Sequence, residues 1–190
     1  MNKAQFLNRF HLFPLAPSQH KFKFADRVKA AAVLIPLVET ERGLDIVFTR
    51  RADHLKHHPG QISFPGGKVE KQDANYVETA LREAHEEIAL NPEQVDVLGQ
   101  LEPYHTITGY QVTPIIGLIS GELALQADEQ EVAEIFTVPL SFFVDHQNHL
   151  KVSTFHKGKK HHVYFMPYKH YNIWGATAAM LADLVAHIHH

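Results

Sequence analysis

The sequence contains no cysteine among its 190 residues. This absence excludes disulfides, thiolate nucleophiles, cysteine-based zinc sites and iron–sulfur clusters. Also absent is any apolar run near the roughly 20 residues that a helix needs to cross a bilayer. The N-terminal segment has mixed charge and lacks the apolar stretch and cleavage site of a signal peptide. We therefore expect a soluble, cytoplasmic protein with no membrane partner.

An excess of positive charge is absent as well. Lysine and arginine number 18 against 21 aspartates and glutamates, which gives a net charge of −3 with neutral histidines. This balance argues against a protein that grips nucleic acid through bulk positive charge. The hydrophobic fraction of 45 % is typical of a folded chain, and the length suits one ordinary domain.

Histidine is abundant, with 16 residues, and some of them lie close together in the sequence. None of these groups has a recognised zinc-ligand spacing, so scattered surface histidines are the favoured interpretation over a zinc site. The groups are His54, His57 and His58; His161 and His162; and His187, His189 and His190.

The hydrophobic pattern predicts an α/β protein with a mixed sheet between helices. Residues 30–38 and 44–49 predict a hairpin, and residues 74–90 and 173–187 predict helices. Further strands are expected at 95–101, 112–119, 134–138, 151–155 and 162–166. A short amphipathic helix followed by a proline-broken segment is expected within the first 25 residues. We interpret 1–27 as an N-terminal extension and 28–190 as the main domain.

The helix predicted over residues 74–90 carries a cluster of carboxylates. Glu83, Glu86 and Glu87 fall within about 100° of one another on a helical wheel, opposite an apolar stripe. Like charges at this spacing cost a few tenths of a kcal/mol per pair, a cost that Mg²⁺ or Mn²⁺ would reverse because both prefer oxygen ligands. Arg82 is placed to hold one of these carboxylates. A solvated acidic face is the alternative.

The pair Gly66-Gly67 lies just before this helix and is a turn signal. Glycine lets a backbone carbonyl approach a bound ion, and Lys68 supplies a cation for phosphate. Asp73 has two interpretations, one in catalysis and one as a cap at the start of the helix.

Gly67, Arg82-Glu83 and Glu86-Glu87 resemble the Nudix box, a signature of pyrophosphate hydrolases that reads G-x5-E-x7-R-E-U-x-E-E-x-G-U, with U a bulky aliphatic residue. The spacing from Gly67 to Arg82 is one residue longer than in this pattern. Asp73 takes the place of the first glutamate of the box, and Ala89 takes that of its final glycine.

A second signature adjoins the box. Residues 47–67 resemble LLTxRSx3Rx3Gx3FPGG, which marks the branch of the Nudix family that cleaves coenzyme A. The match holds at Thr49, Arg51, Gly60 and residues 64–67, and it departs at Ala52 and Lys56. Residues 106–114, 131–136, 138–140 and 173–178 also look like this branch.

This resemblance implies an α/β/α sandwich whose loop–helix–loop holds Mg²⁺ or Mn²⁺. The implied metal ligands are Glu83, Glu86, Glu87 and the carbonyl of Gly67. Glu86 and Glu87 are the candidates for the general base, with Arg82 orienting the carboxylates. Glu131 or Glu134 would supply a further ligand or base, with ordinary surface charge as the alternative.

The implied substrate is coenzyme A or its thioesters, cleaved to adenosine 3′,5′-bisphosphate and 4′-phosphopantetheine derivatives. Arg51, Arg50 and Lys68 are candidate phosphate contacts. Other small-molecule substrates stay open, namely ADP-ribose, NADH, nucleotide sugars and dinucleoside polyphosphates. A non-catalytic module that binds a nucleotide or a protein is a further alternative, and a homodimer is one option for assembly. Tyr104, Tyr110 and Trp174 are either ligand contacts or core residues.

Overall fold

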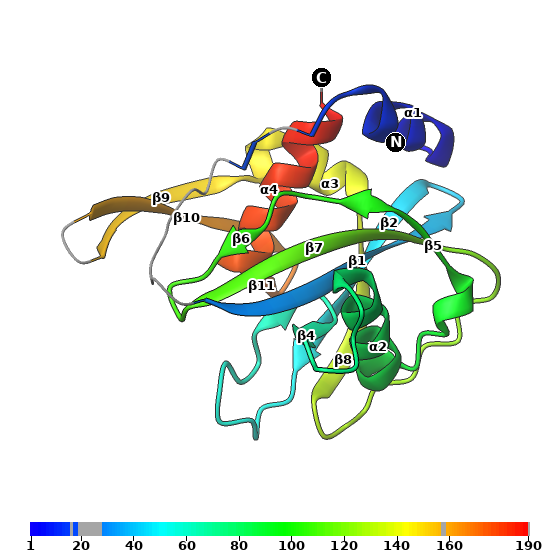
Figure 1. Cartoon of the computed structure of the whole chain (residues 1–190). Coiled ribbons are helices and arrows are strands. Elements are labelled where there is room, and N and C mark those ends of the chain that lie inside the picture. Colours follow the sequence, from blue (N-terminus) through cyan, green and yellow to red (C-terminus); the bar gives the residue numbers. More distant parts are fainter. Residues whose placement is uncertain (16, 19–27, 157–158, 190) are drawn as a thin grey trace.

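A mixed eight-stranded sheet forms the centre of the computed structural model, which describes residues 1–15, 17–18, 28–156 and 159–189 (Figure 1). Its main path runs β3-β2-β1-β7-β5, while β4 pairs with β1, β6 with β7 and β8 with β2. The strands are β1 (Lys29–Thr40), β2 (Gly43–Arg51), β3 (Ile62–Ser63), β4 (Gly66–Lys68), β5 (Val95–Gln100), β6 (Tyr104–His105), β7 (Tyr110–Ile119) and β8 (Val132–Pro139).

The two central strands, β1 and β7, are parallel, and the other pairs in this sheet are antiparallel. Both central strands are apolar on both faces, which is the pattern of a strand covered on each side. Along β1, Ile35 and Leu37 belong to one buried cluster, whereas Ala32 and Leu34 belong to another. The sheet therefore separates two hydrophobic cores.

Helices cover both faces of the sheet (Figure 1). Helix α2 (Tyr76–Ile88) packs on one core through Ala80, Ala84 and Ile88. The other core lies under α1 (Lys3–Leu12), α3 (Leu140–Val144) and α4 (Ala176–Ile188). This arrangement confirms the expected α/β/α sandwich with a mixed sheet. None of the helices in the described part of the chain is long and apolar enough to span a membrane.

A second, antiparallel sheet has the order β11-β10-β9 and leads into α4. Its strands are β9 (Leu150–His156), β10 (Lys159–Tyr168) and β11 (Tyr171–Trp174), and two 3₁₀ turns, η1 (Pro92–Gln94) and η2 (His146–Asn148), complete the elements. The helix predicted over 173–187 was wrong at its start. Ile173 and Trp174 pair with β10 instead, because this places Ile173 in the core opposite Met166.

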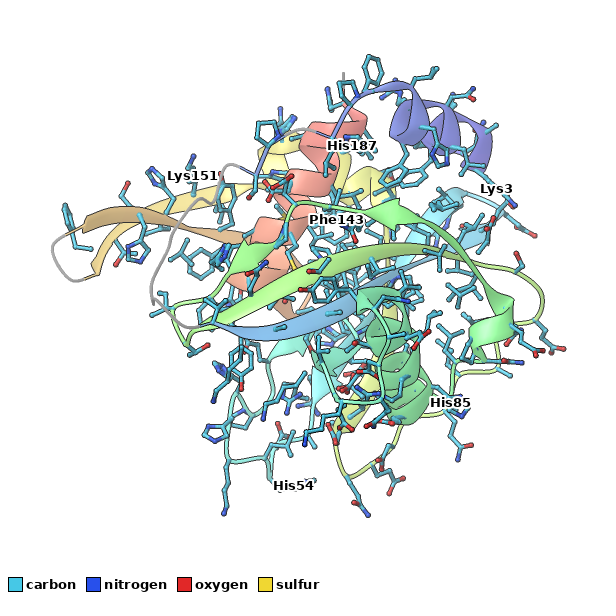
Figure 2. The ribbon with its side chains drawn as sticks, viewed as in Figure 1. Lys3, His54, His85, Phe143, Lys151 and His187 are labelled. Carbon is cyan, nitrogen blue, oxygen red and sulfur yellow. The ribbon has the colours of Figure 1, made fainter. Side chains whose placement is uncertain are left out.

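The N-terminal helix α1 packs against the C-terminal helix (Figures 1 and 2). Phe6 and Phe10 are buried, and the ring of Phe10 meets that of His187 edge-on at 4.9 Å between centroids. His187 Nε2 lies 2.9 Å from the Phe10 carbonyl oxygen, to which it donates. The expected short helix is thus confirmed, whereas most of the proline-broken segment that follows it lies outside the described residues.

Helix α2 is shorter than the predicted 74–90 because both of its ends are capped. Asn75 is the N-cap, and its side chain accepts from the Glu78 amide at 3.0 Å. Ala89 ends the helix in the left-handed conformation, with φ 54° and ψ 26°. Glycine is the residue that usually holds this position, because a Cβ is unfavourable there.

We expect Ala89→Gly to raise the free energy of unfolding by about 0.5 to 1 kcal/mol. Glycine adopts the left-handed conformation without the steric penalty of a Cβ, and little packing is lost because the Ala89 side chain is exposed. Urea unfolding would measure the change. Ala182→Gly is the matched control: the same substitution inside α4 should lower stability by about 1 kcal/mol. A loss of stability in the Ala89 variant would contradict the interpretation.

Candidate active site

The Gly66-Gly67 pair is part of strand β4 and not an open turn, which corrects the expectation from the sequence. It pairs with β1, Gly66 opposite Val33 and Gly67 opposite Ala32. A Cβ at Gly66 would overlap the Ala32 carbonyl and Val33, and a Cβ at Gly67 would overlap the Glu83 carboxylate. Two glycines are needed here because β4 lies pressed between β1 and helix α2.

Arg82 is the centre of a hydrogen-bonded network at this contact. Its Nε and Nη2 donate to the two carboxylate oxygens of Asp73 at 3.0 and 3.1 Å. Its Nη1 lies 3.0 Å from Glu83 Oε1 and 3.1 Å from Glu86 Oε2. Nη2 also donates to the Lys68 carbonyl oxygen at 3.2 Å. The guanidinium therefore joins β4, the 69–75 loop and helix α2 in one geometry.

Asp73 does not cap the helix, a role that belongs to Asn75. Its side chain is 3 % exposed, and besides Arg82 it accepts from the Glu70 amide and the Thr79 hydroxyl, each at 2.9 Å. The bonds from Arg82 and from the Glu70 amide hold the pKa of Asp73 well below its usual range, and the partnership raises the pKa of Arg82. Asp73 is thus a positioning residue for Arg82.

The carboxylates of α2 differ in environment. Glu86 is 57 % exposed in its side chain, whereas Glu87 is only 5 % exposed and turns into the protein. Burial raises the pKa of Glu87 to about 8, assisted by the negative charges of Glu131 and Glu83 and opposed by Arg51. Burial likewise raises the pKa of Glu83, against the effect of Arg82.

These electrostatic effects identify which predicted residues the fold brings together. Glu131, immediately before β8, raises the pKa of both Glu83 and Glu87 although it is 44 residues beyond Glu87 in sequence. Its loop meets α2 because the Asp128 amide donates to the Glu87 carbonyl oxygen and the Glu131 amide to the Asp128 carbonyl oxygen, each at 2.9 Å. Arg51 acts on Glu87 with the opposite sign. We call Glu83, Glu86, Glu87 and Glu131 the acidic cluster.

The acidic cluster does not form a finished metal site. Within the described residues, no three acidic or histidine side chains converge on one point suited to a metal ion. Glu83 and Glu86 both face Arg82 instead. The chemistry still fits a hard divalent cation, because the donors are oxygens and a cation would offset the burial and the like-charge repulsion that raise the pKa of Glu83 and Glu87.

Three other predicted residues have different surroundings. Arg50 pairs with Asp53 at 2.8 Å and lies 3.6 Å from Glu134. Glu134 also accepts from the Tyr171 hydroxyl at 2.5 Å, and this bond raises the pKa of Tyr171 to about 12. Lys68 has an exposed side chain and contributes its carbonyl oxygen to Arg82. Arg50 and Glu134 thus partner each other.

Two residues, His58 and Gln61, line each of three neighbouring cavities. Arg51 and Gly66 line the smallest, of about 240 Å³. Arg50, Glu134 and Tyr171 line the second, of about 410 Å³. His58 has a positive φ of 55°, uncommon outside glycine. The sequence analysis missed Gln61 and Tyr171, and no motif singles them out.

The mixed sheet between helices, with a carboxylate-bearing helix against a glycine strand, defines an α/β protein with an acidic site suited to cations. The model of the NUDIX domain matches residues 28–166, more than half of the chain. The chain therefore belongs to the Nudix hydrolase family. Enzymes of this family generally use divalent metals such as Mg²⁺ or Mn²⁺ and act on small molecules.

Two relatives match along almost their whole length. A protein of Enterobacter sp. (strain 638) named "Uncharacterized Nudix hydrolase NudL" is 42 % identical over 189 residues, covering 96 % of this chain and 93 % of that protein. The protein of the same name from Klebsiella pneumoniae subsp. pneumoniae is 38 % identical over 188 residues, covering 99 % and 95 %.

Solved structures agree on the fold. The Nudix hydrolase RenU of M. Smegmatis has a TM-score of 0.52 at 23 % identity and covers 67 % of this chain and 80 % of its own. A MutT/nudix family protein from Enterococcus faecalis has a TM-score of 0.52 at 16 % identity, with 97 % and 68 % covered. At these identities the likeness concerns the fold.

We expect Asp73→Asn to lower the free energy of unfolding by about 2 kcal/mol at pH 7, because Arg82 loses its charged acceptor. The pKa of Asp73 is lower in the folded protein than its ordinary 3.8, so its contribution is present above that pH and is lost as the pH falls. The difference between variant and wild type should therefore shrink below about pH 4. Urea titrations at several pH values would measure this difference.

Asp96→Asn, at an exposed position of β5, is the control. A constant difference down to pH 2 would refute the assignment.

The buried Glu87 predicts a pH dependence opposite to that of Asp73: in metal-free protein, the free energy of unfolding falls as the pH rises. Its pKa rises from 4.5 to about 8 on folding, so the folded state binds more protons and stability declines as the pH rises between these values. We expect the free energy of unfolding of Glu87→Gln to fall by about 2 to 4 kcal/mol less than that of the wild type over this pH range. Unfolding in a chelator at pH 5, 6.5 and 8 would show it. The remaining slope belongs to Glu83, and an unchanged slope in the variant would argue against burial of a charged Glu87.

Proposed function

We propose that this Nudix hydrolase cleaves the diphosphate bond of coenzyme A or its thioesters, giving adenosine 3′,5′-bisphosphate and 4′-phosphopantetheine or its acyl form. The observation that carries the proposal is the position of Arg51. This residue of the second signature acts on Glu87 of the Nudix box and lines the 240 Å³ cavity beside it. The signature for coenzyme A and the box for hydrolysis therefore meet at one site.

In this proposal Glu83, Glu86, Glu87 and the Gly67 carbonyl would hold Mg²⁺ or Mn²⁺, with Glu131 as a further ligand or base. When bound, the ion would neutralise phosphate charge and lower the pKa of the attacking water. Gly67 supports this role because only a residue without a Cβ lets the Glu83 carboxylate lie against β4.

The protein's own residues would perform three tasks. Arg82, held by Asp73, would keep Glu83 and Glu86 aligned on one side of the helix. Arg51 would bind the diphosphate beside Glu87, since a guanidinium matches phosphate oxygens in bidentate fashion. Either Glu86, which is exposed, or Glu87, which is buried, would accept the proton from the attacking water.

A substrate panel tests the proposal. Purified protein with Mg²⁺ or Mn²⁺ is incubated with coenzyme A, acetyl-coenzyme A, ADP-ribose, NADH and diadenosine polyphosphates, and the products are resolved by chromatography. We expect the coenzyme A compounds to be cleaved with the highest kcat/KM and a chelator to abolish turnover. Faster cleavage of another compound would replace the proposed substrate, and no cleavage at all would favour a binding module.

Glu86→Gln serves as the catalytic variant in the same assay. It should lower turnover by at least about 100-fold, since it removes a carboxylate from the reacting centre, and it should leave the unfolding midpoint close to wild type. Glu78→Gln is the matched control on the same helix, where Glu78 accepts from the Ala74 amide outside the acidic cluster. Equal turnover in the two variants would remove Glu86 from the mechanism.

A further inference from the structure

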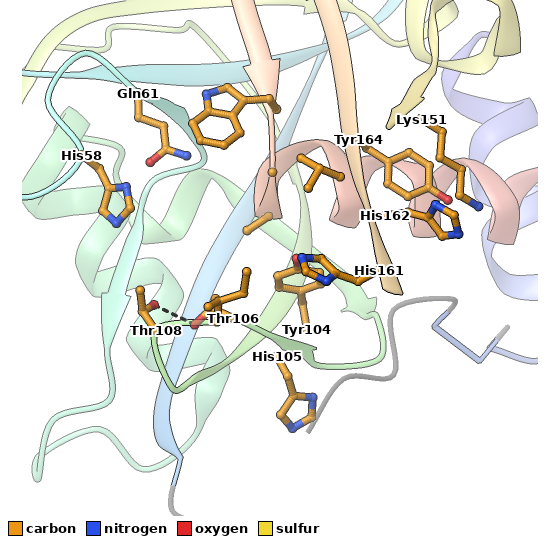
Figure 3. A pocket seen from close by; sticks show the side chains of 15 residues that line it. His58, Gln61, Tyr104, His105, Thr106, Thr108, Lys151, His161, His162 and Tyr164 are labelled. Atoms are coloured by element: carbon orange, nitrogen blue, oxygen red, sulfur yellow. Dashed lines mark hydrogen bonds between the residues drawn. The ribbon is translucent and has the colours of Figure 1, made fainter. Parts of the chain in front are cut away.

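The largest of the three cavities, about 420 Å³, lies between the β6–β7 region and the β9–β11 sheet (Figure 3). Its volume falls in the range of small-molecule sites. Residues from five separate parts of the chain line it, including His58 and Gln61 from the 52–61 loop and Trp174 from β11. None of them belongs to the acidic cluster.

The lining combines aromatic surface with groups that carry or can gain positive charge. Tyr104, Tyr164 and Trp174 supply rings, and Lys151 lies with its Nζ 5.3 Å from the centre of the Tyr164 ring. Four histidines add to the lining: His58, His105, His161 and His162. Among the described lining residues there is no aspartate or glutamate. Rings suit a flat base, and ammonium and imidazole groups suit a phosphate.

This cavity adjoins the cavity beside the acidic cluster. His58, Gln61 and Ala176 line both, while Arg51 and Gly66 line only the one next to Glu87. The backbone at His58 is held by a hydrogen bond from the Gln61 amide to the His58 carbonyl, 3.2 Å long. A ligand with its diphosphate at Arg51 therefore has a neighbouring space for one of its two ends.

We propose that the 420 Å³ cavity binds the nucleoside end of the substrate, with the base against the aromatic rings and Lys151 binding a phosphate on the ribose. The inference rests on the proposed function and extends it to the ribose phosphate. This group distinguishes coenzyme A from nucleotides with an unmodified ribose. The pantetheine arm carries no charge, whereas the lining offers the Lys151 ammonium and aromatic rings. The nucleoside end, with its base and its ribose phosphate, therefore fits this lining better.

Trp174 is the only tryptophan in the chain, so its fluorescence reports on this cavity directly. In the presence of a chelator, we expect adenosine 3′,5′-bisphosphate to change the emission with an affinity at least about tenfold higher than AMP, because one charge-assisted phosphate contact is worth that much. Pantetheine should bind more weakly than either. Equal affinity for the two nucleotides, or preferential binding of pantetheine, would overturn the proposal.

Lys151→Ala tests the phosphate contact, and Lys3→Ala is the matched control on α1, far from the cavity (Figure 2). The Lys151 variant should bind the two nucleotides equally. In the hydrolysis assay its KM for coenzyme A should rise about tenfold with little change in kcat, and its KM for dephospho-coenzyme A should stay unchanged. Retained discrimination between the two nucleotides would refute the role of Lys151.

The outcomes separate this inference from the proposed function. Discrimination between the nucleotides without cleavage of coenzyme A would support the cavity and refute the function. Cleavage of coenzyme A and dephospho-coenzyme A with the same KM would refute the cavity while the function stands.

Discussion

The contact between Arg82 and Asp73 is the interaction on which the candidate site depends. A guanidinium can hold several carboxylates in place only if it is itself fixed, and Asp73 does this with two hydrogen bonds from a side chain that is 3 % exposed. Glu83 and Glu86 then meet the remaining donor, Nη1. Because Arg82 also reaches the Lys68 carbonyl, the helix and strand β4 keep one relative position.

Glu83 and Glu87 hold negative charge where water is scarce. A carboxylate such as Glu87, 5 % exposed and close to Glu131 and Glu83, is costly in its charged form. Arg51 offsets part of this cost. Helix α2 packs on the apolar core formed with β1 and β7, which holds Glu87 at its buried position. A divalent cation would stabilise the same charges, which links the strain in the free protein to its proposed chemistry.

Periodicity predicted the local elements well. The apolar stripe along α2 predicted a helix, and the apolar runs of β1 and β2 with a turn between them predicted a hairpin; the structure confirms both. The errors arose where pairing between strands decides the local structure. Pairing with Met166 made Ile173 a strand residue, and pairing with β1 made the Gly66-Gly67 pair part of a strand. Arg50 and Glu134 came together as partners because β2 pairs with β8.

The sequence by itself determined the class of fold and the grouping of Glu83, Glu86 and Glu87, since helical spacing alone puts them on neighbouring positions. The resemblance to the Nudix box then pointed to their chemistry. Only the tertiary structure decided what each carboxylate does. Exposure and neighbouring charge set the difference between Glu86 and Glu87, and both depend on how α2 packs. The role of Asp73 depends on how the 69–75 loop folds back onto α2. The cavity around Trp174 is lined by segments far apart in the chain, which spacing in sequence cannot reveal.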